Sequence, residues 1–373
     1  MSVSTTIRDS EAIATCYEHH FVDCYGEIMA NIVICVDGTW NRPEEDLERD
    51  FPTNVLTLAR AINPSTNSVK QHVFYDWGLG SYHNNLIAGA TGCGIHKNIL
   101  DGYRYIVQNY SVNDKIYLFG FSRGAYTVRA LSGLINNCGI LKRPDARRIS
   151  EAWKIYKSPL RRNHLEGEVS RQFRANYCHT SRKVIFVGVW DTVGALGIPF
   201  SLMGLFESHD EFYNDKMGSN VSIARHALAI DEQREDFEPT IWTPRAGVDL
   251  RQVWFAGVHA DVGGSYPPDK QTGNRASDTS LAWMLDEAAN AGLTVEPHIR
   301  KSLTDGTKGK LHRSRKHVYR FRSPLHRPLI IDGKPTMIHA SVKSRYFADP
   351  GYRPPQLREL VERFGWDNIN VDV

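Results

Sequence analysis

Short apolar runs, each followed by glycine or polar residues, recur along this chain. Runs of this kind are typical of buried strands, and they occur at residues 32–36, 73–75, 116–119, 183–189 and 252–258. Between them, apolar residues recur with helical spacing at 54–62, 95–110, 150–156, 221–230 and 279–289. Strands that alternate with helices predict an α/β fold, in which a mostly parallel, doubly wound sheet carries helices on both faces.

The sequence around Ser122 predicts a more specific fold. Residues 120–124 read Gly-Phe-Ser-Arg-Gly, between a predicted strand and a helical pattern that includes Val128, Leu131 and Leu134. G-x-S-x-G in this context indicates a nucleophile elbow, a strained turn that exposes the serine hydroxyl. The glycines are needed because side chains there would collide with the tight turn. We therefore predict an α/β-hydrolase-like sheet.

The segments outside the strand–helix pattern predict the domain organisation. Residues 1–29 are polar without a clear period and predict a poorly ordered N-terminal extension, followed by a hydrolase domain at 30–298. Residues 142–182 are basic and irregular, which favours a cap inserted after the elbow helix. Residues 299–373 are basic and dotted with proline, and they predict a segment packed on the domain or trailing from it.

Two further polar residues at predicted strand ends complete a candidate catalytic site. A serine needs a base to accept its proton, and that base needs a group that orients it. Ser122, Asp191 and His259 follow separate predicted strands, in the order serine, acid, histidine that α/β-hydrolases use. We predict that these three residues form the triad, because the carboxyl ends of parallel strands meet at one crevice.

The oxyanion of the reaction requires backbone N–H donors. The Arg123 amide follows the nucleophile directly and is the first candidate. The turn after the first strand, Asp37-Gly38-Thr39, is placed to supply the second. Asp37 itself either lines the crevice or braces this turn.

Alternatives to the acid and the base remain open at this point. Asp261 is a rival acid, although it stands only two residues from His259 and favours a role in bracing the turn. His226 is a rival base with Asp231 near it, but it falls in the predicted helix at 221–230. A helical histidine is more often packed or solvated than catalytic.

Other chemistries find less support. An aspartyl phosphatase would need an aspartate two residues before Asp37, where this chain has Cys35, and no G-x-x-x-x-G-K-[ST] phosphate loop occurs. No residues have metal-ligand spacing, so we expect neither a metal nor another cofactor. The net charge of +3 gives no sign of a nucleic-acid surface. Six scattered cysteines, and no signal peptide or apolar run of 18 residues, predict a cytoplasmic protein, with a signal-less secretion route left open.

Seven ordered motifs give the chain a family resemblance. They are VDGTWN, YDWGLG, GATGCGI, GFSRGA, GVWDTVGALG, HALAIDEQREDF and WFAGVHADVGG, spread over residues 31–289. This set resembles the α/β-hydrolases that include the phospholipase (Tle-type) effectors of bacterial type VI secretion. The resemblance implies a Ser-Asp-His esterase and, in the effectors, phospholipase activity on membrane lipids. Ser122 lies in the matching GFSRGA motif, whereas Asp191 and His259 are assigned by strand-end position.

The leading functional hypothesis is a serine hydrolase of carboxylic esters that acts on a small-molecule or lipid ester. The apolar segment at 195–206 favours a lipid, because it would receive an acyl chain or touch a membrane surface transiently. The alternative interpretation is that the apolar side chains of 195–206 pack in the protein core. The alternative hypothesis is a catalytically inactive binding or interaction protein that keeps the fold. The oligomeric state, and a choice between effector and housekeeping enzyme, stay open.

Overall fold

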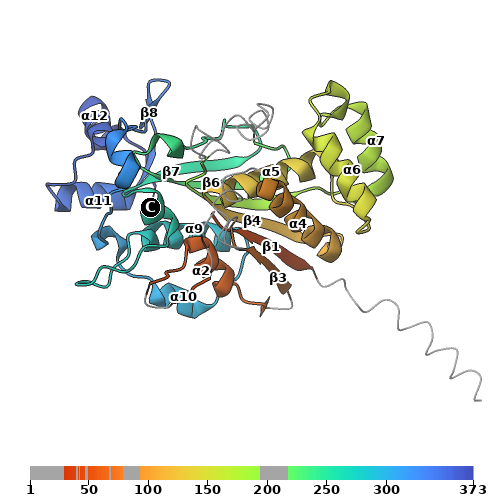
Figure 1. The fold of residues 1–373 in the computed structure, drawn as a ribbon, viewed down its shortest axis with the longest axis horizontal. Helices are drawn as coiled ribbons and strands as arrows, with labels where there is room; N and C mark the ends of the chain where they lie inside the picture. The colour runs from red at the N-terminus through yellow and green to blue at the C-terminus, as the bar shows by residue number, and fades with distance from the viewer. Residues whose placement is uncertain are drawn as a thin grey trace, which may run out of the picture.

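The computed structural model describes residues 29–38, 41, 43–46, 49–66, 69–78, 93–193 and 217–372. Nine described strands form one sheet in the order β11-β10-β7-β6-β5-β4-β1-β3-β2, seen edge-on in part in Figure 1. Neighbouring strands are parallel except for β2, which is antiparallel to β3. The strands span Ala30–Val36 (β1), Ser65–Thr66 (β2), Val69–Asp76 (β3), Lys115–Phe121 (β4), Val184–Trp190 (β5), Val221–Ala229 (β6), Asp249–Phe255 (β7), Met337–His339 (β10) and Val371–Asp372 (β11).

Helices cover both faces of this sheet (Figure 1). Alternate residues of β1 show this, because Ile32, Ile34 and Val36 belong to one buried cluster, whereas Val33 and Cys35 belong to another. The first cluster includes residues of α4 (Cys93–Asn109), α5 (Arg123–Cys138), α6 (Ala146–Lys157) and α7 (Glu168–Tyr177). The second includes α2 (Asn54–Ala61), α9 (Ser277–Asn290) and α10 (Pro297–Ser302). The predicted α/β-hydrolase-like, doubly wound sheet is confirmed.

One element was predicted wrongly. Residues 221–230 were expected to form a helix, but Val221–Ala229 is β6, paired on both sides with β5 and β7. A strand in the middle of a doubly covered sheet is buried on both faces, so its sequence has no alternation that distinguishes it from a buried helix. His226 therefore lies on a central strand and is fully buried there.

The residues after 298 contribute to the central sheet. β10 extends it beyond β7, and β11 pairs with β10. Two helices, α11 (Ala340–Ala348) and α12 (Pro355–Phe364), pack with these strands in a third buried cluster that includes Trp254, Ile338 and Leu360. The smaller elements of this part are a two-stranded sheet and 3-10 turns, among them η6 (His317–Phe321). The proposed division at residue 298 stays a prediction.

Several expectations fall outside the described residues. They are the N-terminal extension, of which only Met29 is described, the residue Thr39 and the apolar segment at 195–206. The basic insertion at 142–182 consists of α6, the short turn Arg161–Asn163 and α7, which Figure 1 shows at the end of the molecule opposite α11 and α12. Its role as a cap remains a prediction. No helix in the described part of the chain is long and apolar enough to cross a membrane.

Candidate active site

The turn between β4 and α5 has the geometry of a nucleophile elbow. Ser122 has φ 57° and ψ −123°, a conformation that L-residues rarely adopt and that tends to occur at functional sites. A side chain at Gly124 would place its Cβ 2.1 Å from the Val36 carbonyl oxygen, and one at Gly120 would lie 2.5 Å from the Gly124 oxygen. Both glycines are therefore required for β1, β4 and α5 to approach this closely.

Backbone contacts fix the elbow beside the neighbouring strands. The Ser122 N–H donates to the Trp190 carbonyl at 3.1 Å, which brings the serine next to the residue that precedes Asp191. On the other side, a Cβ built on Gly38 would lie 3.0 Å from the Ser122 Cβ. The elbow thus lies between the turns that follow β1 and β5.

Asp191 and His259 form a close pair. His259 Nδ1 lies 2.5 Å from Asp191 Oδ2, and both side chains are buried. Asp191 directly follows β5, with φ 39°, and His259 begins the short helix α8 (His259–Gly263) after β7. Because an ionised carboxylate only accepts hydrogen bonds, Nδ1 carries the proton and Nε2 of the neutral ring keeps its lone pair.

The environment of Asp191 keeps it ionised. Oδ1 accepts hydrogen bonds from the Ala229 amide at 3.0 Å and from Arg327 Nη1 at 2.7 Å, and Arg327 Nη2 lies 3.1 Å from Oδ2. Arg327 is completely buried. Burial by itself would raise the pKa of Asp191, but the charge of Arg327 and the hydrogen bond from His259 outweigh it. The pKa of this carboxyl therefore lies below its ordinary value.

Two aromatic rings hold the His259 imidazole beside the elbow. The Phe121 ring stacks on it with ring centroids 4.5 Å apart, and Phe121 is the residue before Ser122. The Phe237 ring meets the imidazole edge-on at 4.9 Å. No hydrogen bond joins the Ser122 hydroxyl to His259 among the described residues. The structure therefore brings a histidine–carboxylate pair to the side of the elbow.

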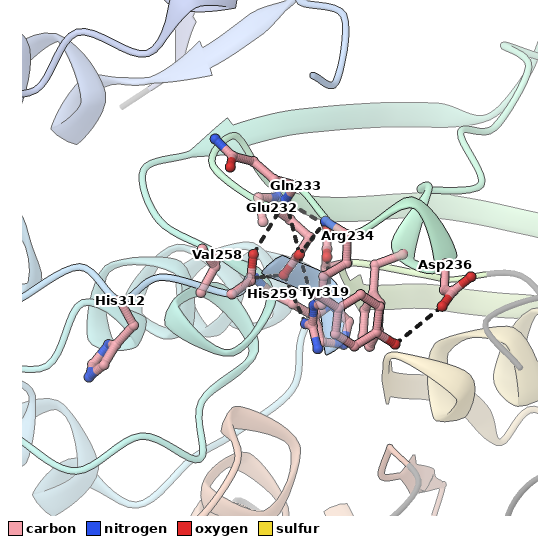
Figure 2. A network of polar contacts seen from close by, with 12 residues as sticks. Glu232, Gln233, Arg234, Asp236, Val258, His259, His312 and Tyr319 are labelled. Carbon is pink, nitrogen blue, oxygen red and sulfur yellow. Dashed lines mark hydrogen bonds and ion pairs between the residues drawn. The ribbon is translucent and has the colours of Figure 1, made fainter. Parts of the chain in front are cut away.

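The segment after β6 supports His259 from its backbone side. Glu232 is fully buried, accepts a hydrogen bond from the His259 amide at 3.2 Å, and forms an ion pair with Arg234 at 2.9 Å (Figure 2). Burial would raise the pKa of Glu232, but Arg234 lowers it below its usual value. The Arg234 guanidinium in turn lies over the Phe237 ring, 3.4 Å from its centroid. The segment after β6 therefore contacts His259 twice, through Glu232 at the backbone amide and through Phe237 at the imidazole ring.

The rival candidates have other partners. Asp261 is buried and binds His312, with 2.6 Å between Oδ1 and Nδ1, and Figure 2 shows His312 lying apart from His259. His226 accepts the Thr192 amide through Nε2 at 3.1 Å, and its Nδ1 has no hydrogen-bond partner. Burial, reinforced by the charge of Arg129, lowers the pKa of His226 to about 3, so its ring stays neutral.

The turn after β1 is built around Asp37. Its Oδ2 accepts hydrogen bonds from the Thr53 hydroxyl at 2.5 Å and the Tyr75 hydroxyl at 2.9 Å, and its Oδ1 accepts the Gly38 amide at 2.8 Å. Burial raises the pKa of Asp37 to about 6, although these hydrogen bonds by themselves would lower it. Asp37 therefore braces the turn that places Gly38 against Ser122.

Sequence reasoning missed Arg327, Glu232, Arg234 and Phe237. Arg327 belongs to the basic, proline-dotted segment at 299–373, and nothing local distinguishes it from its neighbours. The other three lie in the motif HALAIDEQREDF, which was noted without a role. The available signal was a single arginine among four acidic residues at 231–236, directly after the apolar run at 227–230. No cluster of three or more His, Cys, Asp or Glu suited to a metal ion occurs in the described part.

A family of known proteins matches most of this chain. The model described as "T6SS, Phospholipase effector Tle1-like, catalytic domain" matches residues 30–287, from β1 to α9. The chain belongs to this family. The Tle1-like match thus covers the elbow, Asp191, His259 and the segment after β6, but it ends before Arg327.

Individual proteins similar to this Tle1-like chain were also found. The Uncharacterized protein YEL023C of Saccharomyces cerevisiae is 27% identical over 237 residues, which are 57% of this chain but 33% of the yeast protein. A Tle1 effector bound to the VgrG spike of the type VI secretion system has a TM-score of 0.40 at 18% identity, over 66% of this chain and 53% of that one. The crystal structure of an uncharacterized protein from Pseudomonas aeruginosa has a TM-score of 0.42 at 17% sequence identity, over 74% of this chain and 49% of that one. The chain matches only a third to about half of the length of these relatives.

Proposed function

We propose that this chain is a serine hydrolase of carboxylic esters that acts on lipids, as a lipase or phospholipase. The observation that carries the proposal is the buried His259–Asp191 pair, 2.5 Å apart, held by Phe121 beside the strained Ser122 elbow. The description of the Tle1-like family as a catalytic domain of phospholipase effectors supports a lipid substrate.

In the proposed mechanism, His259 Nε2 accepts the Ser122 proton as Oγ attacks the ester carbonyl carbon. His259 then donates this proton to the leaving alkoxide, and water hydrolyses the acyl-enzyme by the same route. The ionised Asp191 fixes Nδ1–H of the imidazole and stabilises the imidazolium that forms. Arg327 keeps Asp191 ionised, because its charge outweighs the effect of burial.

The oxyanion would be stabilised by backbone donors at the elbow. We assign the Arg123 amide as the first donor, because it directly follows the nucleophile at the start of α5. The turn of Asp37, Gly38 and Thr39 would supply the second donor. In the structure the Gly38 amide donates to Asp37 Oδ1, so its use requires this bond to open when substrate binds.

The test is covalent labelling with a fluorophosphonate probe, together with hydrolysis of short-acyl esters, long-acyl esters and phospholipids. We expect the wild type to be labelled and to cleave esters, and the Ser122→Ala variant to lose both properties while it stays folded. Ser132→Ala is the matched control, because this serine lies on α5 and its buried hydroxyl has no hydrogen-bond partner. This control should keep the label.

The outcome also separates the enzyme from a binding protein with the same fold. A folded wild type that takes no label and cleaves no ester would contradict the proposal and favour the binding role. Labelling and hydrolysis that persist in Ser122→Ala would assign the nucleophile to another residue.

A further inference from the structure

The chain between Asp305 and Asp332 contains no aspartate or glutamate, and we call residues 306–331 the basic loop. Its cations have different surroundings. Arg327 is buried against Asp191, Arg322 forms an ion pair with Asp236 at 2.9 Å, and Lys308 forms one with Asp305. The remaining basic side chains, Lys310, Arg313, Arg315, Lys316 and Arg320, form no ion pair with any described carboxylate. The loop therefore presents a surplus of positive charge.

Phe321 stands at the end of η6 between two arginines of this loop. It is 93% exposed, the most exposed large apolar side chain in the described part of the chain. Arg315 holds the turn that presents it, because its guanidinium donates to the carbonyls of Tyr319 and Arg322. A phenylalanine ring that is exposed to water contributes little to the stability of the fold. The same ring, surrounded by basic side chains, is favoured at the interface of a lipid bilayer.

A cavity of about 660 Å³ opens beside the same turn. Arginines from the basic loop and from the chain before α12 line it, namely Arg313, Arg315, Arg320 and Arg353, together with His312. Its carboxylate is Asp231, which is partly buried and accepts hydrogen bonds from the Gly257 amide and the Tyr352 hydroxyl, and burial raises its pKa to about 6. The cavity therefore suits an anionic group with several oxygen atoms, such as a phosphate ester.

The basic loop is bound firmly to the segment that supports the catalytic histidine. The Leu325 amide donates to the Gln233 carbonyl at 3.0 Å, and the Tyr319 hydroxyl donates to Asp236 at 3.2 Å (Figure 2). Gln233 and Asp236 flank Arg234, whose guanidinium lies over Phe237. A surface bound through this loop is thereby held in a fixed relation to His259.

We propose that the basic loop is a docking surface for anionic bilayers, in which Phe321 inserts at the interface and the arginine-lined cavity receives a lipid phosphate. This inference rests on the proposed function, because it explains how a lipid hydrolase without a spanning helix in its described part reaches its substrate. Each arginine near an anionic membrane surface contributes an attraction that multiplies the partition coefficient severalfold. The bound lipid also lies next to the segment that carries Glu232 and Arg234.

The test is sedimentation of the full-length Ser122→Ala protein with vesicles of phosphatidylcholine, with and without phosphatidylglycerol. We expect binding to the anionic vesicles and much weaker binding to the neutral ones. Phe321→Ala should lower the partition coefficient about tenfold. Arg313→Gln combined with Arg320→Gln should lower it about thirtyfold, since two charges are removed.

Two matched controls keep the side-chain changes but move them elsewhere. Phe347→Ala removes a phenylalanine that is 63% exposed on α11, and Arg147→Gln with Arg171→Gln removes two exposed charges from α6 and α7. Both controls should bind like the parent. Circular dichroism checks that every variant is folded.

The docking surface would be overturned if Phe321→Ala and the arginine variant both bound the vesicles as strongly as the parent. Dependence on the arginines without dependence on Phe321 would overturn the insertion of Phe321, since the protein would then be held at the bilayer surface by charge alone. Because the parent carries Ser122→Ala, the result needs no turnover. A chain that binds vesicles through this loop but hydrolyses no ester would contradict only the proposed function.

Discussion

A single carboxylate, Asp191, connects the groups that matter most at the candidate site. It accepts hydrogen bonds from His259, from the Ala229 amide and from both terminal nitrogens of Arg327. Its neighbours come from the end of β6, from α8 and from the basic loop. The chemistry of the site therefore depends on residues that are distant in the sequence.

The two candidate acids, Asp191 and Asp261, can be distinguished by substitution. We expect Asp191→Asn to lower kcat about 10⁴-fold, because an amide no longer holds Nδ1–H of His259 in the required tautomer. Asp261→Asn changes a carboxylate that binds His312 instead, and it should lower kcat less than tenfold. Ester hydrolysis by the two variants checks this. A larger loss in Asp261→Asn would assign the acid to Asp261.

Arg327 should contribute strongly to stability. Arg327→Met leaves Asp191 buried without its counter-charge, which typically costs about 3–5 kcal/mol at pH 7. Arg358→Met on α12 is the control, because Arg358 and Glu362 are exposed and 3.7 Å apart, and it should change the free energy of unfolding by less than about 0.5 kcal/mol. Urea denaturation measures both.

The pH dependence distinguishes charge from packing at Arg327. The folded-state pKa of Asp191 lies below its unfolded value of about 3.9, so the stabilisation is present above that pH and is lost as the pH falls through the folded-state pKa. In Arg327→Met, burial raises the pKa of Asp191, and protonation relieves the unpaired charge. The loss in the free energy of unfolding of Arg327→Met, relative to the wild type, should therefore be smaller at pH 4 than at pH 7. A deficit that is equal at both values would show that Arg327 acts by packing alone.

At this scale the sequence indicated the residues with reactive groups but not those that hold them. Ser122, Asp191 and His259 follow predicted strands, and parallel topology brings strand ends together. Arg327 follows no strand and lies among many basic residues, so only the tertiary structure reveals its burial. Their catalytic roles stay a prediction.

At the scale of elements, the close approach of α5 to β1 depends on one glycine. Gly124→Ala would place a Cβ 2.1 Å from the Val36 carbonyl oxygen, and neither backbone can move without disturbing the centre of the sheet. We expect a loss of about 3 kcal/mol in the free energy of unfolding. Thermal unfolding with circular dichroism measures this.

Gly133→Ala is the control on the same helix. Its new Cβ would meet the Tyr156 hydroxyl oxygen at 2.7 Å, so only one side chain has to shift there and no backbone segment of the sheet. The change in the free energy of unfolding should stay within about 1 kcal/mol. Equal effects of the two substitutions would show that the elbow tolerates a side chain at position 124.

Most elements could be predicted from the sequence, and the exceptions have physical causes. Amphipathic helices and short apolar strands gave clear patterns for β1, β4, β5, α2 and α4. The sequence of β6 predicts a helix because both faces of this strand are buried, so its apolar residues do not alternate with polar ones. β10 and β11 are only a few residues long, and such short strands have too little sequence for a period.

At the scale of the molecule, the sheet is completed by the end of the chain. β10 covers the edge of β7, and the buried cluster around Trp254 and Leu360 packs on this side. Trp283 of α9 also donates to Asp372 of β11 at 2.8 Å. The C-terminal residues are therefore joined to the rest of the fold by strand pairing, by the third buried cluster and by this hydrogen bond.

A truncation tests this dependence. The fragment that ends at residue 298 exposes the edge of β7, loses the third cluster and leaves Asp191 without Arg327, so we expect it to aggregate or to lack a cooperative unfolding transition. Soluble expression and thermal denaturation beside the full chain measure this. A fragment that melts cooperatively at the temperature of the full chain would establish 30–298 as an independent domain.

The pairing of Asp191 with Arg327 has a consequence for the order of events in the cell. A ribosome makes the chain from its amino end, so Ser122, Asp191 and His259 emerge well before Arg327. Until Arg327 has been added, a nascent chain carries Asp191 without the cation that keeps this carboxylate ionised in the folded protein. For the proposed hydrolase, a chain not yet extended past Arg327 would lack an ionised acid, so ester hydrolysis would begin only after that residue is in place.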